Sequence, residues 1–251
     1  MYVPAVPASE TAETNSSDLP WSELWFFGVT IFLGAFLLFQ VQPVIGKYIL
    51  PWFGGTPGVW TTCLLFFQCL LLGGYAYAHW LSQLVPRQQA QIHLTLLVIV
   101  GVILGGVFFL MIGGLSPIEW LKPDPATAAD RPVLGILTLL VVGIGLPYLV
   151  LSSTGPLIQA WFARKYEGRS PYRLYALSNV GSLLALITYP FLVEPYTTRG
   201  LQVGAWAFGM VGFAVVCGWL ARSIRRIPET EKESESKHQL KVPALKRQLL
   251  W

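Results

Sequence analysis

The feature that most constrains this chain is a series of uncharged apolar stretches, each about 20 residues long. A helix of that length crosses the roughly 30 Å hydrocarbon core of a bilayer. Only 12% of the 251 residues are charged, whereas soluble domains average about 25%, so a soluble fold could not cover this apolar surface. The sequence therefore predicts an all-α integral membrane protein.

The apolar stretches divide the chain into six expected transmembrane helices. Two of them are long and contain prolines at which we expect the helix to break: residues 25–50, with Pro43, and residues 133–162, with Pro147 and Pro156. The other four expected spans cover residues 59–84, 92–112, 174–193 and 201–221.

These spans form a membrane domain, residues 22–222, between two polar tails. The tail 1–21 is acidic, and the tail 223–251 is charged, so that we expect disorder there and, at its end, the start of a further span. Lys and Arg concentrate on the cytoplasmic side of membrane proteins. With both termini inside, 13 of the 17 Lys and Arg residues are cytoplasmic and 4 lie in outer loops. We therefore predict cytoplasmic termini and a multi-pass location in the cell (inner) membrane.

The two proline-containing spans also indicate an internal repeat. Pro43 is followed 14 residues later by Pro57, and Pro156 is followed 15 residues later by Pro171. The second proline of each pair directly follows a Thr or Ser residue. Because each unit would hold three spans, the two units must have opposite orientations, as in half of a major-facilitator-like fold. The alternative is that prolines recur independently at the ends of membrane helices.

Polar side chains near the expected breaks are the best candidates for a binding site. Amides and hydroxyls within an apolar span must face other helices or a cavity, because lipid cannot satisfy their hydrogen bonds. The candidate substrate-binding residues are Gln40, Gln42, Lys47, Ser152, Ser153, Thr154, Gln159 and Asn179. The alternative is that these groups only join helices, and that Lys47 extends to the membrane surface.

The sequence does not indicate a catalytic site. No Asp or Glu lies inside an expected span, and no catalytic or nucleotide-binding motif is present. His79 and His93 allow a proton or metal site, but interfacial histidines with hydrated tips are the favoured interpretation. The three cysteines lie in apolar stretches, where a thiol acts as a small hydrophobe. We predict no catalytic residue, metal, cofactor or nucleic-acid partner.

Three longer strings resemble a known family. They are LFQVQP at residues 38–43, ILPWFGGTP at residues 49–57 and SPYRLYALSN at residues 170–179. They are similar to the N-terminal membrane region of bacterial fused major-facilitator-like/spermidine-synthase-like proteins, and the resemblance covers about residues 24–221. It implies a cytoplasmic aminopropyltransferase-like domain or subunit as a partner. The Gly-rich cofactor loop and acidic amine-binding residues of that domain have no match here, so the resemblance implies a truncated or split member without synthase activity.

Two functions remain open. The first is a transporter-like domain that binds a small polar solute between the two three-helix units; the lack of a carboxylate within the spans argues against a polyamine. The second is a non-catalytic membrane anchor or scaffold for an aminopropyltransferase-like partner. An enzyme active by itself is the least favoured interpretation.

Overall fold

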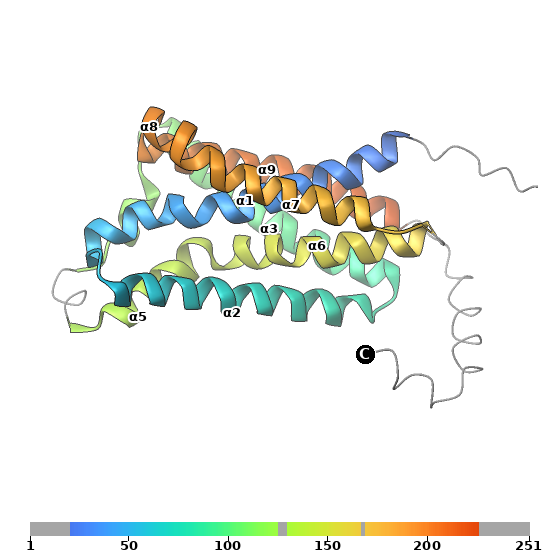
Figure 1. Ribbon diagram of the computed structural model, residues 1–251, viewed down its shortest axis with the longest axis horizontal. Helices are drawn as coiled ribbons and strands as arrows, with labels where there is room; N and C mark the ends of the chain where they lie inside the picture. The colour runs from blue at the N-terminus through green and yellow to red at the C-terminus, as the bar shows by residue number, and fades with distance from the viewer. Residues whose placement is uncertain (1–20, 125–129, 167–168, 226–251) are drawn as a thin grey trace, which may run out of the picture.

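A computed structural model describes residues 21–124, 130–166 and 169–225, which form a bundle of long helices lying along one axis (Figure 1). No β-strand occurs within these ranges. The elements of the first half are α1 (Trp21–Phe53), α2 (Pro57–Ser82), α3 (Pro86–Ile112) and the short 3₁₀ helix η1 (Pro117–Leu121). Those of the second half are α5 (Pro132–Leu140), η2 (Val141–Gly145), α6 (Leu146–Lys165), α7 (Tyr172–Thr188), η3 (Tyr189–Val193), α8 (Glu194–Tyr196) and α9 (Arg199–Ile224).

Within the described residues, six helical segments are long and apolar enough to cross a membrane, which confirms the predicted all-α class and agrees with six expected spans. Their bounds are Glu23–Phe53, Pro57–Ser82, Pro86–Ile112, Pro132–Lys165, Tyr172–Tyr196 and Arg199–Ile224. A proline opens three of these segments, at Pro57, Pro86 and Pro132. Proline suits the first turn because the N–H that it lacks would have no helical partner there.

The outer surface of the bundle is apolar. Leu72, Val102, Phe109 and Phe191, from three different helices, are each 70–74% exposed. A surface of this kind would be unstable in water but is required in a bilayer, where lipid tails replace water as the solvent. The exposed faces of the helices therefore fit contact with lipid.

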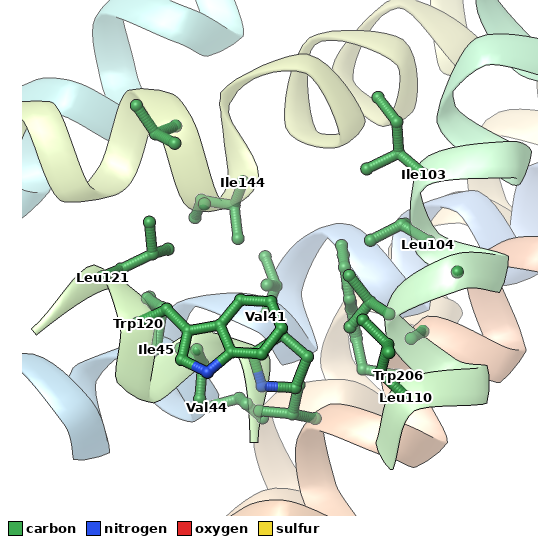
Figure 2. Close-up of a pocket in the computed structure, with 18 of the residues that line it drawn as sticks. Val41, Val44, Ile45, Ile103, Leu104, Leu110, Trp120, Leu121, Ile144 and Trp206 are labelled. Atoms are coloured by element: carbon green, nitrogen blue, oxygen red, sulfur yellow. The ribbon is translucent and has the colours of Figure 1, made fainter. Parts of the chain in front are cut away.

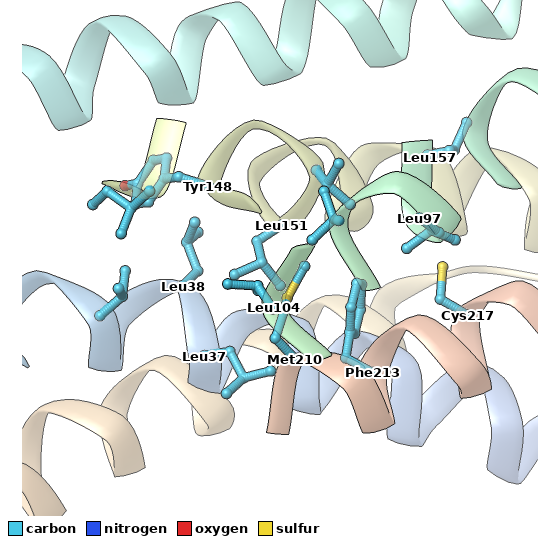
Figure 3. Packing of buried hydrophobic residues seen from close by; sticks show 14 of the residues in the cluster. Leu37, Leu38, Leu97, Leu104, Tyr148, Leu151, Leu157, Met210, Phe213 and Cys217 are labelled. Atoms are coloured by element: carbon cyan, nitrogen blue, oxygen red, sulfur yellow. The ribbon is translucent and has the colours of Figure 1, made fainter. Parts of the chain in front are cut away.

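Inside the bundle, α1 lies against α7, α9 and α6, while α2 packs along α6 and α3 along α9. Figure 3 shows apolar side chains from α1, α3, α6 and α9 meeting in one core, among them Leu37, Leu104, Leu151 and Phe213. Glycine makes two of these pairings very close. A Cβ atom at Gly181 would lie 2.7 Å from the backbone oxygen of Phe32, and one at Gly74 would lie 1.9 Å from the hydroxyl of Ser152.

The structure corrects the predicted helix breaks. α1 runs without interruption through Pro43, and α6 runs through Pro156. The irregular segment of the fourth span is instead η2, a π-helical turn that ends two residues before Pro147. A π turn shifts the hydrogen-bond register, so it accommodates a residue that has no N–H to donate. Pro147 is thus the only one of the three prolines that adjoins an interruption of its helix.

An ion pair joins α1 to another helix at each end of the bundle. At the end formed by η1, α8 and the C-terminus of α1, called here the η1 end, Lys47 Nζ lies 3.3 Å from Glu194. At the opposite end, called here the Tyr166 end, Lys165 Nζ lies 2.5 Å from Glu23, and the Tyr166 hydroxyl donates to the same carboxylate at 2.6 Å. Burial and then this hydrogen bond raise the pKa of Tyr166 above its usual range.

Candidate functional site

Four of the predicted binding residues form hydrogen bonds to other groups of the bundle itself. The Gln42 amide donates to the hydroxyl of Tyr148 at 3.3 Å, which joins α1 to α6. The Ser152 hydroxyl lies 2.9 Å from the carbonyl oxygen of Leu149 in its own helix and 3.4 Å from that of Leu70 in α2. The hydroxyls of Ser153 and Thr154 both donate to the carbonyl of Val150, at 2.8 and 2.9 Å.

The other four predicted residues lie apart from this group. Lys47 pairs with Glu194 and lies 5.8 Å from the ring centre of Tyr189. Gln159 is half-buried on α6, and Asn179 is exposed on α7. Gln40 is buried, and its Oε1 has no hydrogen-bond partner among the described residues. None of the eight residues lines either of the two cavities described below.

A cavity of about 470 Å³ lies in the half of the bundle nearer the η1 end (Figure 2). Its size falls within the roughly 300–1,000 Å³ of ordinary small-molecule sites. None of the eight predicted residues lines it. Its walls come from α1, α3, η1, η2 and α9 and consist of Val41, Val44, Ile45, Val102, Ile103, Leu104, Gly106, Val107, Leu110, Pro117, Ile118, Trp120, Leu121, Val142, Gly143, Ile144, Val203, Trp206 and Ala207.

Two features of the sequence create this space. Gly106 on α3 has no side chain, and a Cβ atom there would meet no other atom within 4 Å. Opposite α3, the π turn η2 brings Gly143 and Ile144 to the cavity wall. Figure 2 shows Ile103 and Leu104 on one side of the space, with Trp120 and Leu121 on the other.

The chemistry of the cavity is apolar. Among the described residues no charged side chain lines it, and the indole N–H of Trp206 is already used, because it donates to the Leu37 carbonyl at 2.9 Å. Trp120 supplies the other indole N–H of the wall. A polar solute would lose its hydration there, at a cost of roughly 2–7 kcal/mol for each group left without a hydrogen bond. The cavity therefore suits an apolar molecule, or the apolar part of an amphipathic one.

A second cluster, at the Tyr166 end, is polar but completely packed. His93 is fully buried, with Nδ1 3.5 Å from the Tyr77 hydroxyl and Nε2 3.8 Å from the Cys217 thiol. The indole of Trp161 meets the His93 ring edge-on and donates to Gln89 Oε1 at 2.9 Å. The prediction of a hydrated tip is therefore wrong for His93, because side chains from three other helices, α2, α6 and α9, cover it. The prediction fits His79, which is exposed.

The described part of the chain contains no group of three or more His, Cys, Asp or Glu side chains placed to hold a metal ion. The three cysteines are free; Cys63 and Cys217 are buried and Cys69 is exposed.

Comparison with known proteins finds no matching family model, no similar curated protein and no similar solved structure. The resemblance described above thus remains an expectation from the sequence.

Proposed function

We propose that this chain is a transporter-like membrane domain that binds an apolar or amphipathic molecule in the cavity beside η1. The supporting observation is the cavity of about 470 Å³, whose walls are all apolar and come from both halves of the chain. α1 and α3 supply one part of the wall, and η2 and α9 supply the other. This proposal keeps the predicted place of binding, between two three-helix units, and replaces the polar solute with an apolar one.

The packing of the helices supports two related units, one of α1–α3 and one of α5–α9. If each helix is exchanged for its counterpart in the other unit (α1 for α6, α2 for α7 and α3 for α9), the α1–α7 pair becomes the α6–α2 pair. Both of these pairs are closely packed. The α1–α6 and α3–α9 pairs each turn into themselves. The α1–α9 pair departs from this pattern, because it is more extensive than its counterpart α3–α6. With three spans each, the two units have opposite orientations, as in inverted-repeat transporters.

Shape, rather than the hydrophobic effect alone, would select the ligand. Lipid tails are as apolar as leucine, so transfer from the bilayer into the cavity changes the solvation of an apolar molecule little. An empty cavity, however, leaves its lining atoms without van der Waals partners on one side. A molecule that fits the space restores these contacts, and this gain is the source of binding.

A matched pair of glycine variants tests the proposal. Gly106→Leu places a side chain in the cavity, whereas Gly105→Leu, at the neighbouring position outside its wall, makes the same change of residue; a Cβ atom meets nothing within 4 Å at either site. The purified protein is photolabelled with a diazirine-bearing fatty acid, and the labelled peptides are identified by mass spectrometry. We expect the label on peptides of α3 and α9 that line the cavity. Gly106→Leu should lower the amount of label at least about fivefold, whereas Gly105→Leu should leave it unchanged. Equal labelling of both variants would refute a cavity site.

A second candidate, a membrane anchor for a cytoplasmic partner, rests on the distribution of charge. The η1 end carries four described cations, Lys47, Lys122, Arg131 and Arg199. The Tyr166 end carries more: Arg87, Arg164, Lys165, Arg169, Arg173, Arg222 and Arg225. By the positive-inside rule, the Tyr166 end would face the cytoplasm of a bacterial inner membrane. The sequence resemblance supplies the identity of the partner, an aminopropyltransferase-like domain.

The anchor is tested by flotation of vesicles that contain the purified chain. A soluble aminopropyltransferase-like domain of the resembling family is added, and vesicles of the same lipid without the chain are the control. Co-flotation only with the chain, abolished by Arg169→Glu with Arg173→Glu, would support the anchor. Equal flotation with empty vesicles would exclude it.

A further inference from the structure

Beside the apolar cavity lies a smaller space whose mainly apolar wall also carries three polar side chains, those of Asp124, Arg131 and Thr138. This second cavity, of about 280 Å³, is lined by Leu121, Pro123, Asp124, Arg131, Leu134, Gly135, Thr138, Leu139 and Val142. Leu121 and Val142 also line the apolar cavity, so the two spaces are neighbours that share part of their walls. An amphipathic molecule could therefore occupy both at once, with its apolar part beside η2 and its polar part near the N-terminus of α5.

The second cavity lies where a lipid headgroup would be. Arg131 directly precedes Pro132, the first residue of the fourth span. Trp120, on η1, is 67% exposed and also lines the apolar cavity. Tryptophan is enriched at the level of lipid headgroups. These positions place the smaller cavity at the level expected for headgroups, with the apolar cavity on the side toward the bilayer centre.

The charges around this space match a headgroup that carries both signs. Arg131 is exposed and takes part in no salt bridge within the described ranges, and its guanidinium can donate two parallel hydrogen bonds to one phosphate. Asp124 and Arg131, one charge of each sign, line the space itself. The adjoining stretch of chain adds one cation, Lys122, and two carboxylates, Glu119 and Asp130. This balance disfavours a headgroup with a net negative charge.

From these observations we infer that the occupant is a zwitterionic phospholipid of the surrounding membrane. One acyl chain fills the apolar cavity, and the phosphodiester lies against Arg131. This inference rests on the proposed function, since it names the ligand of the same cavity. It adds a residue, Arg131, that selects the ligand by its headgroup.

Native mass spectrometry of the protein, after incubation with defined lipids, tests the headgroup site. The lipids are phosphatidylethanolamine, phosphatidylglycerol of the same acyl composition, and a free fatty acid. We expect phosphatidylethanolamine to be retained preferentially, and Arg131→Gln to lower its retention about tenfold. Arg131→Lys should restore part of it, because lysine keeps the charge but loses the paired donors. Arg222→Gln, which removes one exposed cation at the Tyr166 end, is the control and should have no effect.

These experiments distinguish failure of the headgroup site from failure of the apolar site. If Arg131→Gln behaves like Arg222→Gln while Gly106→Leu still abolishes photolabelling of the cavity, the headgroup site is wrong and the apolar site stands. Preference for the fatty acid or for phosphatidylglycerol, or displacement of the bound lipid by inorganic phosphate, would also overturn the phospholipid assignment. Failure of Gly106→Leu to reduce photolabelling would overturn both proposals.

Discussion

The hydrogen bond between Trp161 and Gln89 offers the clearest test of how the Tyr166 end is held together. Both side chains are fully buried, and the indole N–H donates to the amide oxygen at 2.9 Å. The Gln89 amide nitrogen in turn donates to the carbonyls of Ser82 and Leu84, at 3.1 and 2.7 Å, at the turn between α2 and α3. Trp161→Phe removes the indole donor and part of the ring, and it leaves the two hydrogen bonds of the Gln89 amide nitrogen in place.

The expected loss of stability has two parts. Hydrogen bonds between membrane helices contribute about 0.6 kcal/mol on average and about 1.7 kcal/mol at most; because the Gln89 oxygen would stay buried without a partner, we expect a value near the upper limit. Replacing the indole by the smaller phenyl ring also leaves a void at a site with no exposure. Since complete truncation of a buried Trp costs roughly 3–5 kcal/mol, this part should be about 1 kcal/mol. The sum is about 2–3 kcal/mol.

Reversible unfolding by SDS in mixed micelles measures this loss. Trp25→Phe is the control, because Trp25 is 70% exposed and should change stability by less than about 0.5 kcal/mol. A double-mutant cycle with Gln89→Leu isolates the bond itself, with an expected coupling of about 1–1.7 kcal/mol. A coupling near zero, or equal losses for Trp161→Phe and Trp25→Phe, would refute the argument that this contact joins α3 to α6.

Two further predictions concern the contacts of α1. Gly181→Ala should destabilise the bundle by about 1–3 kcal/mol, because its Cβ would lie 2.7 Å from the Phe32 backbone oxygen. Gly200→Ala is the control: its Cβ meets nothing within 4 Å, so it should be neutral or stabilising in the same unfolding assay. The raised pKa of Tyr166 predicts that its contribution to stability is fully present below the ordinary phenol pKa of about 10 and is lost as pH rises above it. Tyr166→Phe should flatten the alkaline part of a stability–pH curve; an unchanged curve would contradict a phenol protonated against Glu23.

The spans could be predicted from the sequence because the bilayer imposes a length and an apolar composition that a local pattern reveals. Prolines such as Pro57 and Pro86 also mark helix starts reliably, since the missing N–H has no partner there. The effect of Pro43 and Pro156 could not be predicted, because continuing the helix past a proline depends on the packing of neighbouring helices. The π turn at residues 141–145 does have a local signal, since Pro147, where the sequence predicts a break, follows it by two residues.

The candidate site was harder to predict than the fold. Sequence reasoning selected polar residues such as Gln42 and Ser153, and the structure shows that their polar groups bond to the bundle itself. The cavity is lined by residues such as Ile144 and Val203, which are chemically the same as residues that face lipid. Only the tertiary arrangement distinguishes them. His93 was misjudged for a related reason, because its place near the end of a span says nothing about which helices cover it.

A cryo-electron microscopy map of the protein in lipid nanodiscs would show whether the bundle is embedded in the bilayer and holds an apolar ligand in the cavity beside η1. We expect six helices crossing the disc and elongated density among Ile103, Ile144 and Trp206, with a head near Arg131. A map in which these side chains meet and close the space, or in which fewer than six helices cross the disc, would contradict this expectation.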